Sequence, residues 1–71
     1  MNNMLLVRAE QWLTELGIKT ERADTVLKVH RDDAAEFGEP SDLLFGLKAG
    51  LASPRLCWGA KDDEWLYLES Y

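Results

Sequence analysis

Seventy-one residues are enough for one small domain and too few for two, because independent domains rarely fall below about 50 residues. Hydrophobic residues make up 46% of the chain and aromatic residues 10%, which excludes a disordered tail, since such tails lack the apolar surface that offsets chain entropy. The formal charge of −5 argues against direct binding to DNA or RNA, which begins with a basic protein surface.

The cysteine count and the hydropathy of the chain indicate where the protein works. Cys57 is the single cysteine and cannot form an internal disulfide. No apolar run approaches the roughly 18 residues of a membrane helix, and the amino-terminal residues lack the basic start of a signal peptide. We therefore expect a cytoplasmic protein that has no membrane partner.

The first segment, residues 4–16, has the clearest period. Its apolar residues recur at spacings of three and four, which is typical of an amphipathic helix. These residues are Leu5, Leu6, Ala9, Trp12, Leu13 and Leu16. Asn3 can cap the amino end, and Gly17 can adopt the left-handed conformation that closes the helix, with Ile18 folding back onto the last turn.

The stretch from Thr20 to Gly38 is compatible with two interpretations. Residues 25–29 are rich in β-branched side chains and short enough for a strand, whereas the apolar residues of 20–36 also fit one helical face. We favour the strand, because a third strand would complete a sheet that a hairpin alone leaves marginal. Asp32–Phe37 then forms a short helical turn that ends at Gly38, and Glu39-Pro40 is a connector.

A second buried helix is predicted for residues 43–51, where Leu43, Leu44, Leu47 and Leu51 share one face and Pro54 follows. Gly46 and Gly50 weaken its helicity by roughly 1 kcal/mol each, so tertiary packing must stabilise it. Because they lack side chains, these glycines also allow another element to approach closely.

The carboxy-terminal segment has the composition of a β-hairpin. Apolar residues 56–58 and 65–68 flank a polar connection, and a turn centred on Lys61 and Asp62 would place Trp58 opposite Trp65 and Leu56 opposite Tyr67. Cys57, Leu66 and Leu68 would then lie on the other face. Both faces of the hairpin are therefore predicted to be apolar.

These elements predict an α+β fold of one domain, residues 1–71, ordered helix, strand, helix, hairpin, with two helices packed on a small antiparallel sheet. The alternative makes residues 20–36 a helix and gives three helices plus a hairpin, the element order of a winged-helix transcription regulator. That alternative is disfavoured because its candidate recognition helix, residues 42–51, offers only Lys48 and also carries Asp42.

No motif points to catalysis or to a cofactor. Cys57 and His30 are single residues of their kinds and lack an accompanying oxyanion turn, so a thiol nucleophile is not expected. His30, Asp32, Asp33 and Glu36 match no calcium-loop or zinc spacing, so no metal is expected. A glycine-rich phosphate loop is absent from the sequence. We expect a non-enzymatic protein without cofactors.

The distribution of charge is more informative than any motif. The acidic excess falls into two clusters, and carboxylates held about 6–7 Å apart on strands or helical turns can resemble a row of backbone phosphates. The two clusters are Asp32, Asp33, Glu36 and Glu39, and Asp62, Asp63, Glu64 and Glu69. Such a row suits a Lys/Arg groove built for nucleic acid. The simpler interpretation is that these residues build turns and keep a small domain soluble.

Aromatic residues of the hairpin suggest a second kind of surface. Trp and Tyr are preferred anchors of protein interfaces, and Trp58, Trp65 and Tyr67 lie next to the acidic residues of the hairpin turn. An exposed hairpin face would combine an aromatic centre with an acidic rim. Alternatively, helices on both sides of the hairpin bury both faces.

A short acidic chain with the clusters Asp32-Asp33-Ala34-Ala35-Glu36 and Asp62-Asp63-Glu64 resembles the small phage-encoded inhibitors known as anti-CRISPR proteins. Several of these inhibitors place Asp and Glu against the nucleic-acid-binding surface of a CRISPR effector complex. The resemblance implies a phage protein acting in the cytoplasm of a bacterial host, with a type I effector as its target. The group shares no common fold, so the resemblance implies nothing about structure.

The expected function is therefore that of a binding inhibitor. The acidic and aromatic residues would block a basic nucleic-acid groove in a larger protein or ribonucleoprotein complex, and the chain itself would be a monomer or homodimer. The alternatives are a protein-interaction module, such as an antitoxin or assembly subunit that uses the aromatic hairpin face, and the winged-helix regulator.

Overall fold

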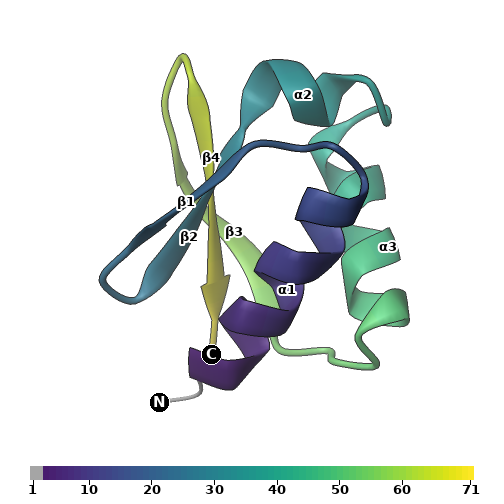
Figure 1. The fold of residues 1–71 in the computed structure, drawn as a ribbon, viewed down its shortest axis with the longest axis vertical. Coiled ribbons are helices and arrows are strands. Elements are labelled where there is room, and N and C mark those ends of the chain that lie inside the picture. The colour runs from purple at the N-terminus through teal and green to yellow at the C-terminus, as the bar shows by residue number, and fades with distance from the viewer. Residues whose placement is uncertain (1–2) are drawn as a thin grey trace.

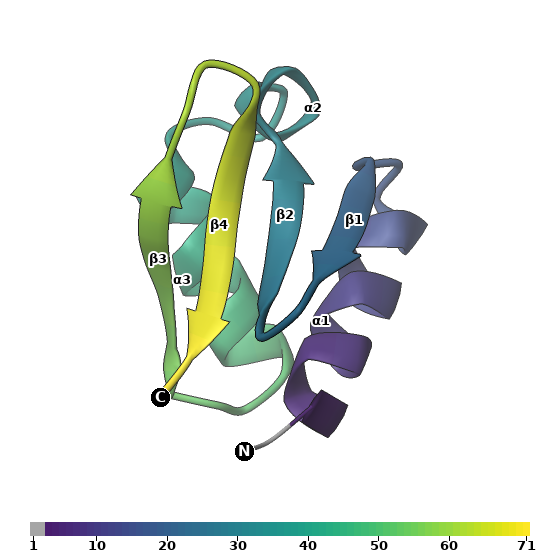
Figure 2. The ribbon, with the colours of Figure 1, turned by 90° about the vertical axis from the view of Figure 1, so that its left-hand side faces the viewer.

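The computed structural model describes residues 3–71. The elements follow in the order α1 (Asn3–Glu15), β1 (Thr20–Ala23), β2 (Val26–His30), α2 (Arg31–Ala35), α3 (Pro40–Gly50), β3 (Leu56–Lys61) and β4 (Trp65–Ser70). The strands form one antiparallel sheet in the order β1-β2-β4-β3, and the helices lie on one of its faces (Figures 1 and 2). The predicted α+β class is confirmed. Within the described range, no helix has the length and apolar character needed to cross a membrane.

Helix α1 ends as its sequence predicts. Gly17 has a φ of +83°, and its N–H donates to the carbonyl of Thr14 at 3.0 Å. The Ile18 N–H folds back to the carbonyl of Leu13, also at 3.0 Å, and both side chains are buried. This is the Schellman arrangement, in which a glycine satisfies carbonyls that the helix leaves free. The capping role predicted for the Asn3 side chain lies outside the side chains that the structure describes.

Residues 20–30 form a hairpin, so the predicted strand is confirmed and the helical alternative is wrong. The sequence interpretation missed β1, which pairs with β2 from Thr20↔Val29 to Ala23↔Val26. Asp24 makes this two-residue turn possible with a φ of +53°, a conformation that Asp tolerates better than most residues. The winged-helix alternative loses its second helix and with it its structural basis.

Helix α3 begins earlier than predicted. Pro40 is its first residue, and the Glu39 N–H donates to the Asp42 carboxylate at 3.2 Å, so Glu39-Pro40 is a helix start and the predicted connector is wrong. Proline suits this position because its missing N–H would have no helical partner there. The short helix predicted before it is confirmed as α2, followed by Gly38 at a φ of +104°.

The β3–β4 hairpin is present, but the predicted pairing is wrong. Trp58 lies opposite Leu68 and Leu56 opposite Ser70, because the strands are longer than predicted and a bulge falls between Trp58 and Lys61. A shift of pairing changes which residues share a face, since side chains alternate along a strand. The Trp58 side chain therefore lies with Leu56, Leu66 and Leu68 on the helix-covered face, and Trp65 and Tyr67 face outward.

One hydrophobic core fills the space between the sheet and the helices. Trp12, Leu44 and Trp58 pack against it while remaining partly exposed. Trp12 lies against α3 where Gly46 and Gly50 leave room, and a Cβ atom built on Gly50 would be only 2.8 Å from the Trp12 Nε1. The close approach predicted for these glycines is confirmed. The buried residues are Leu5, Leu6, Ala9, Leu13, Ile18, Leu27, Val29, Ala34, Leu43, Leu47, Leu51, Leu56, Leu66 and Leu68.

Candidate functional site

The two acidic clusters predicted from sequence meet at one end of the molecule. Helix α2 and the β3–β4 turn lie side by side there (Figures 1 and 2). The Arg31 N–H donates to the Glu64 carbonyl at 2.9 Å, and the Arg31 Nη1 donates to the Asp62 carbonyl at 2.6 Å. These two bonds tie segments that are about thirty positions apart in the chain. We call the eight carboxylates there the acidic end: Asp32, Asp33, Glu36, Glu39, Asp42, Asp62, Asp63 and Glu64.

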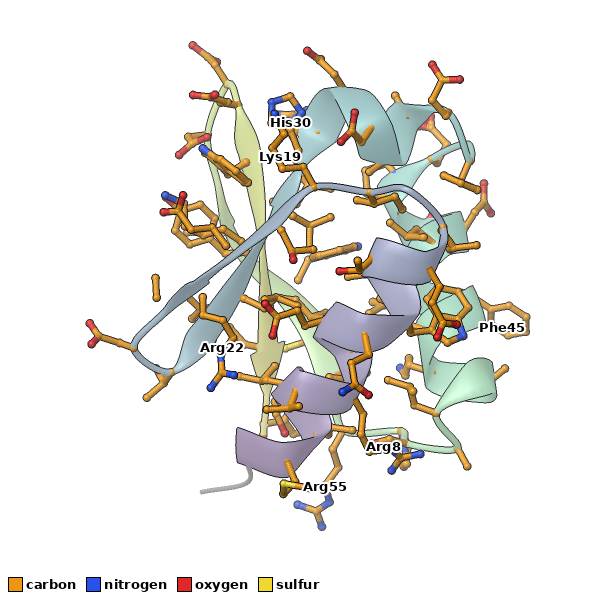
Figure 3. The ribbon with its side chains drawn as sticks, in the orientation of Figure 1. Arg8, Lys19, Arg22, His30, Phe45 and Arg55 are labelled. Atoms are coloured by element: carbon orange, nitrogen blue, oxygen red, sulfur yellow. The ribbon has the colours of Figure 1, made fainter. Side chains whose placement is uncertain are left out.

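The acidic end holds more than the whole net charge of the protein. Segments 31–42 and 61–64 contain these eight carboxylates and two basic residues, a formal charge of −6 against −5 for the complete chain. Lys19 and His30 lie near the same end (Figure 3). Residues 1–30, by contrast, are formally neutral. The excess negative charge is therefore localised and not spread over the surface.

Most of these carboxylates have no cationic partner among the described side chains. Among the side chains that the structure describes, none of the eight carboxylates comes within 4.0 Å of a side-chain nitrogen of Lys or Arg. Glu64 faces the His30 Nε2 at 3.8 Å, a contact that is ionic only when the imidazole is protonated. Carboxylates without internal partners remain available to cations supplied by another molecule.

Asp62 organises the turn that carries its acidic neighbours. One of its carboxylate oxygens accepts hydrogen bonds from the N–H groups of Glu64, at 2.8 Å, and Trp65, at 2.6 Å. The other accepts from the Tyr67 hydroxyl at 3.0 Å. An Asp that accepts from residues two and three positions on is a common way to build a turn. The turn therefore depends on Asp62, and Asp63 and Glu64 project from it.

These hydrogen bonds change the acidity of both partners. The N–H of Trp65, then that of Glu64, and the Tyr67 hydroxyl stabilise the charged form and hold the pKa of Asp62 below its usual value of 3.8. The same contact raises the pKa of the Tyr67 hydroxyl, because its proton is shared with the Asp62 carboxylate and nearby negative charge opposes ionisation. Asp62 therefore stays ionised well into acid.

Two further carboxylates accept hydrogen bonds from backbone N–H groups. An oxygen of Asp33 accepts from the Lys19 N–H at 2.8 Å, which fastens α2 to the segment before β1. Asp42 accepts from the Glu39 N–H at the start of α3. The side-chain carboxylates of Asp32, Glu36 and Asp63 make no hydrogen bond or ion pair with any other described residue, and all three residues are exposed. The acidic end thus contains structural carboxylates and unengaged ones.

A depression of about 510 Å³ lies where the two clusters meet. Asp32 and Glu39 line it from the α2 side, and Asp63 lines it from the β3–β4 turn. Buried Ala34 and Leu66 contribute apolar surface. A cationic side chain with an aliphatic stem matches such a lining, because its stem can contact carbon while its charged head stays among oxygens.

The outer face of the sheet adjoins the acidic end and is not covered by a helix (Figure 2). His30 lies opposite Trp65 and Lys28 opposite Tyr67 in the β2–β4 pairing. The His30 and Trp65 rings meet edge to face at 5.2 Å, and the Lys28 Nζ lies 4.9 Å from the Trp65 ring centre. These side chains are half-buried by one another, so the face is an ordered aromatic and cationic layer.

The residues predicted as partner-binding fall into three places. Asp32, Asp33, Glu36, Glu39, Asp62, Asp63 and Glu64 gather at the acidic end. Trp65, Tyr67 and Glu69 lie on the outer face, where a Cβ built on Gly59 would collide with the Glu69 side chain. Trp58 was wrongly predicted to share their face. Its side chain packs on the core, and its Nε1 donates to the Pro40 carbonyl at 2.8 Å.

Sequence reasoning missed several members of these surfaces. Asp42 belongs to the acidic end, and the signal was available, because an Asp at the third position of a helix that begins with proline is typical of a helix start. Lys28 and His30 share the outer face with Trp65, which could not be found without the β2–β4 pairing.

Within residues 3–71, no three His, Cys, Asp or Glu side chains are arranged to hold a metal ion. Comparisons of the chain with protein-family models, with curated proteins and with solved structures find no match. The functional argument therefore depends on the geometry of the acidic end and of the outer face.

Proposed function

We propose that this protein is a non-enzymatic inhibitor that binds the basic nucleic-acid groove of a larger partner through its acidic end. The observation that carries the proposal is the gathering of eight carboxylates on two separate segments, unpaired with the described Lys and Arg side chains. A groove that binds phosphates presents Lys and Arg side chains, and a fixed set of carboxylates competes for them. A CRISPR effector complex of type I is the partner class that the sequence resemblance suggests.

The structural carboxylates support this function by keeping the charges in place. Asp62 and Asp33 hold the turn and α2 through hydrogen bonds, so the unengaged carboxylates next to them are not on free loops. Pre-organised charges lose less conformational entropy on binding than charges on flexible segments do. Association should be fast at low salt and should weaken as salt screens the charges.

The test is competition with duplex DNA for a purified type I CRISPR effector complex. The wild-type chain should block binding of target DNA, and the block should weaken as salt rises. Asp32→Lys with Asp63→Lys should weaken inhibition by roughly a hundredfold, because two attractive contacts become repulsive. Neither carboxylate makes a hydrogen bond or ion pair with another described residue, so the variant should fold normally.

The matched control places the same change of charge elsewhere. Glu10→Lys with Glu21→Lys alters the β1 side of the molecule, where each residue belongs only to a partly exposed ion pair. This control should inhibit nearly as well as the wild type. If both double variants lose inhibition equally, net charge and not the acidic end is responsible. If the wild type never displaces DNA, this partner class is wrong, and affinity capture from bacterial lysate at low salt becomes the means of finding another.

The uncovered outer face favours a second candidate, a protein-interaction module that uses Trp65 and Tyr67. Aromatic residues beside Lys28 and His30 form the kind of mixed surface that protein interfaces use. Under this candidate Trp65→Ala weakens the complex by roughly thirtyfold or more, and charge reversal at Asp32 and Asp63 leaves it largely intact at high salt.

A further inference from the structure

Helix α3 carries an aromatic side chain that the fold does not use. Phe45 is 76% exposed, the highest value among the large hydrophobic residues that the structure describes. The same helix buries Leu43 and Leu47 in the core, so its packing does not require Phe45. Figure 3 shows Phe45 pointing away from the body of the molecule on the side opposite the sheet. An exposed phenylalanine marks an interaction surface when it belongs to a larger apolar patch or groove.

Phe45 lines a groove of about 420 Å³ that runs to the loop after α3. Ala49 follows Phe45 by one turn of α3, and Ala52 lies just beyond the end of the helix, so both contribute small side chains to the lining. Pro54, in the loop after α3, also lines the groove. We call this the α3 groove, and its lining consists of Phe45, Lys48, Ala49, Ala52, Ser53 and Pro54.

The surroundings of the α3 groove are basic in an otherwise acidic protein. Residues 43–60 contain Lys48 and Arg55 and no Asp or Glu. Arg8 of α1 joins them, because its Nη2 donates to the Leu51 carbonyl at 3.3 Å. Within the described part of the chain, Lys48, Arg55 and Arg8 form no ion pair with an Asp or Glu side chain. The Arg55 Nη1 donates instead to the Tyr71 carbonyl at 3.4 Å.

We propose that the α3 groove is a second docking surface, and that its occupant is an acidic segment of a partner protein that inserts an apolar side chain beside Phe45. Charge complementarity selects this chemistry, since Lys48 lines the apolar groove and residues 43–60 add Arg55 and no carboxylate. The groove has the size for one or two side chains and a peptide backbone, and an aromatic anchor in a pocket is the usual centre of such an interface. This surface uses none of the residues of the acidic end.

The experiment is a selection of random short peptides on the immobilised full chain, followed by binding measurements on the most enriched peptide. Enriched peptides should share an apolar residue flanked by Asp and Glu. Fluorescence anisotropy measures the affinity of the chain for this peptide. Phe45→Ser should lower the affinity by roughly thirtyfold and Lys48→Glu by roughly tenfold. Converting each Asp and Glu of the peptide to Asn and Gln should lower its affinity for the wild-type chain by roughly tenfold, as Lys48→Glu does.

The control is Phe37→Ser, the same chemical change at a phenylalanine that is 43% exposed and lies outside the α3 groove. It should change affinity by less than about twofold. Neutral or basic enriched peptides, no enrichment, or equal binding to the Phe45→Ser chain would overturn the proposal. Sedimentation of the free chain adds one more outcome: a dimer that Phe45→Ser dissociates would assign the groove to a second copy and reject the peptide.

Discussion

The acidic end and the α3 groove use charge in opposite ways. At the acidic end, carboxylates such as Asp62 and Asp33 accept backbone hydrogen bonds, so part of the charge also builds the structure. Around the α3 groove, the carboxyl end of α3 is capped by backbone hydrogen bonds alone, and the Lys48 side chain makes no hydrogen bond or ion pair with another described residue. The comparison teaches that negative charge can be removed from this fold only at selected positions, whereas the positive charge of Lys48 is separable from folding.

The largest expected effect is a loss of stability at Trp58, which connects the sheet to the start of α3 beside the acidic end. Trp58 packs on the core and donates to Pro40, where α3 begins. Trp58→Ala should lower the free energy of unfolding by about 3 kcal/mol, and Trp58→Phe, which keeps most of the ring, by about 1 kcal/mol. Urea unfolding followed by circular dichroism measures both. Equal losses would mean that the hydrogen bond, and not the packing, accounts for the effect.

A second test separates the structural from the unengaged carboxylates by pH. The pKa of Asp62 is lower in the folded protein than its usual value of 3.8, so ionised Asp62 stabilises the fold above that pH. This contribution is lost as the pH falls through the lower folded value. Asp62→Asn should therefore be less stable than the wild type at neutral pH, and the difference should shrink in strong acid. Asp32→Asn, which removes no internal hydrogen bond, should follow the wild type throughout.

A smaller effect concerns the ends of the two long helices. Gly17 after α1 and Ala52 after α3 both occupy the left-handed position of a Schellman arrangement, with φ values of +83° and +52°. Alanine is strained there and glycine is not. Gly17→Ala should lower the free energy of unfolding by about 1 kcal/mol, and Ala52→Gly should raise it by about 0.5 kcal/mol. Thermal unfolding of the two variants should shift in opposite directions, and a destabilised Ala52→Gly chain would contradict the assignment.

The smallest expected effect concerns the exposed charges themselves. Asp32→Asn at the acidic end and Lys48→Gln at the α3 groove should each change the free energy of unfolding by less than about 0.5 kcal/mol. Each should nevertheless reduce binding at its own surface. A loss of stability at either position would mean that the charge has an internal partner and would remove the distinction between structural and unengaged charges.

The parts of the fold that sequence predicted well depend on local signals. The first helix was recognisable because leucines recur at helical spacing and Gly17 ends it, and the helix before Gly38 was recognisable for similar reasons. Strand β1 was missed because its four residues alternate weakly and two of them are exposed. The predicted hairpin register was wrong because it did not allow for the bulge between Trp58 and Lys61. Gly59 was the available signal, since an isolated glycine inside a strand often marks a bulge.

The sequence by itself determined the α+β class, the positions of its main helices and the existence of two acidic clusters, because periodicity, helix ends and charge are properties of neighbouring residues. Only the tertiary structure decided that Asp32 and Asp63 line one depression, that Trp58 faces the core, and that Phe45 is left uncovered. Those outcomes depend on which strands pair and in what register. The pairing is decided by burial of the whole apolar set at once, which no single segment encodes.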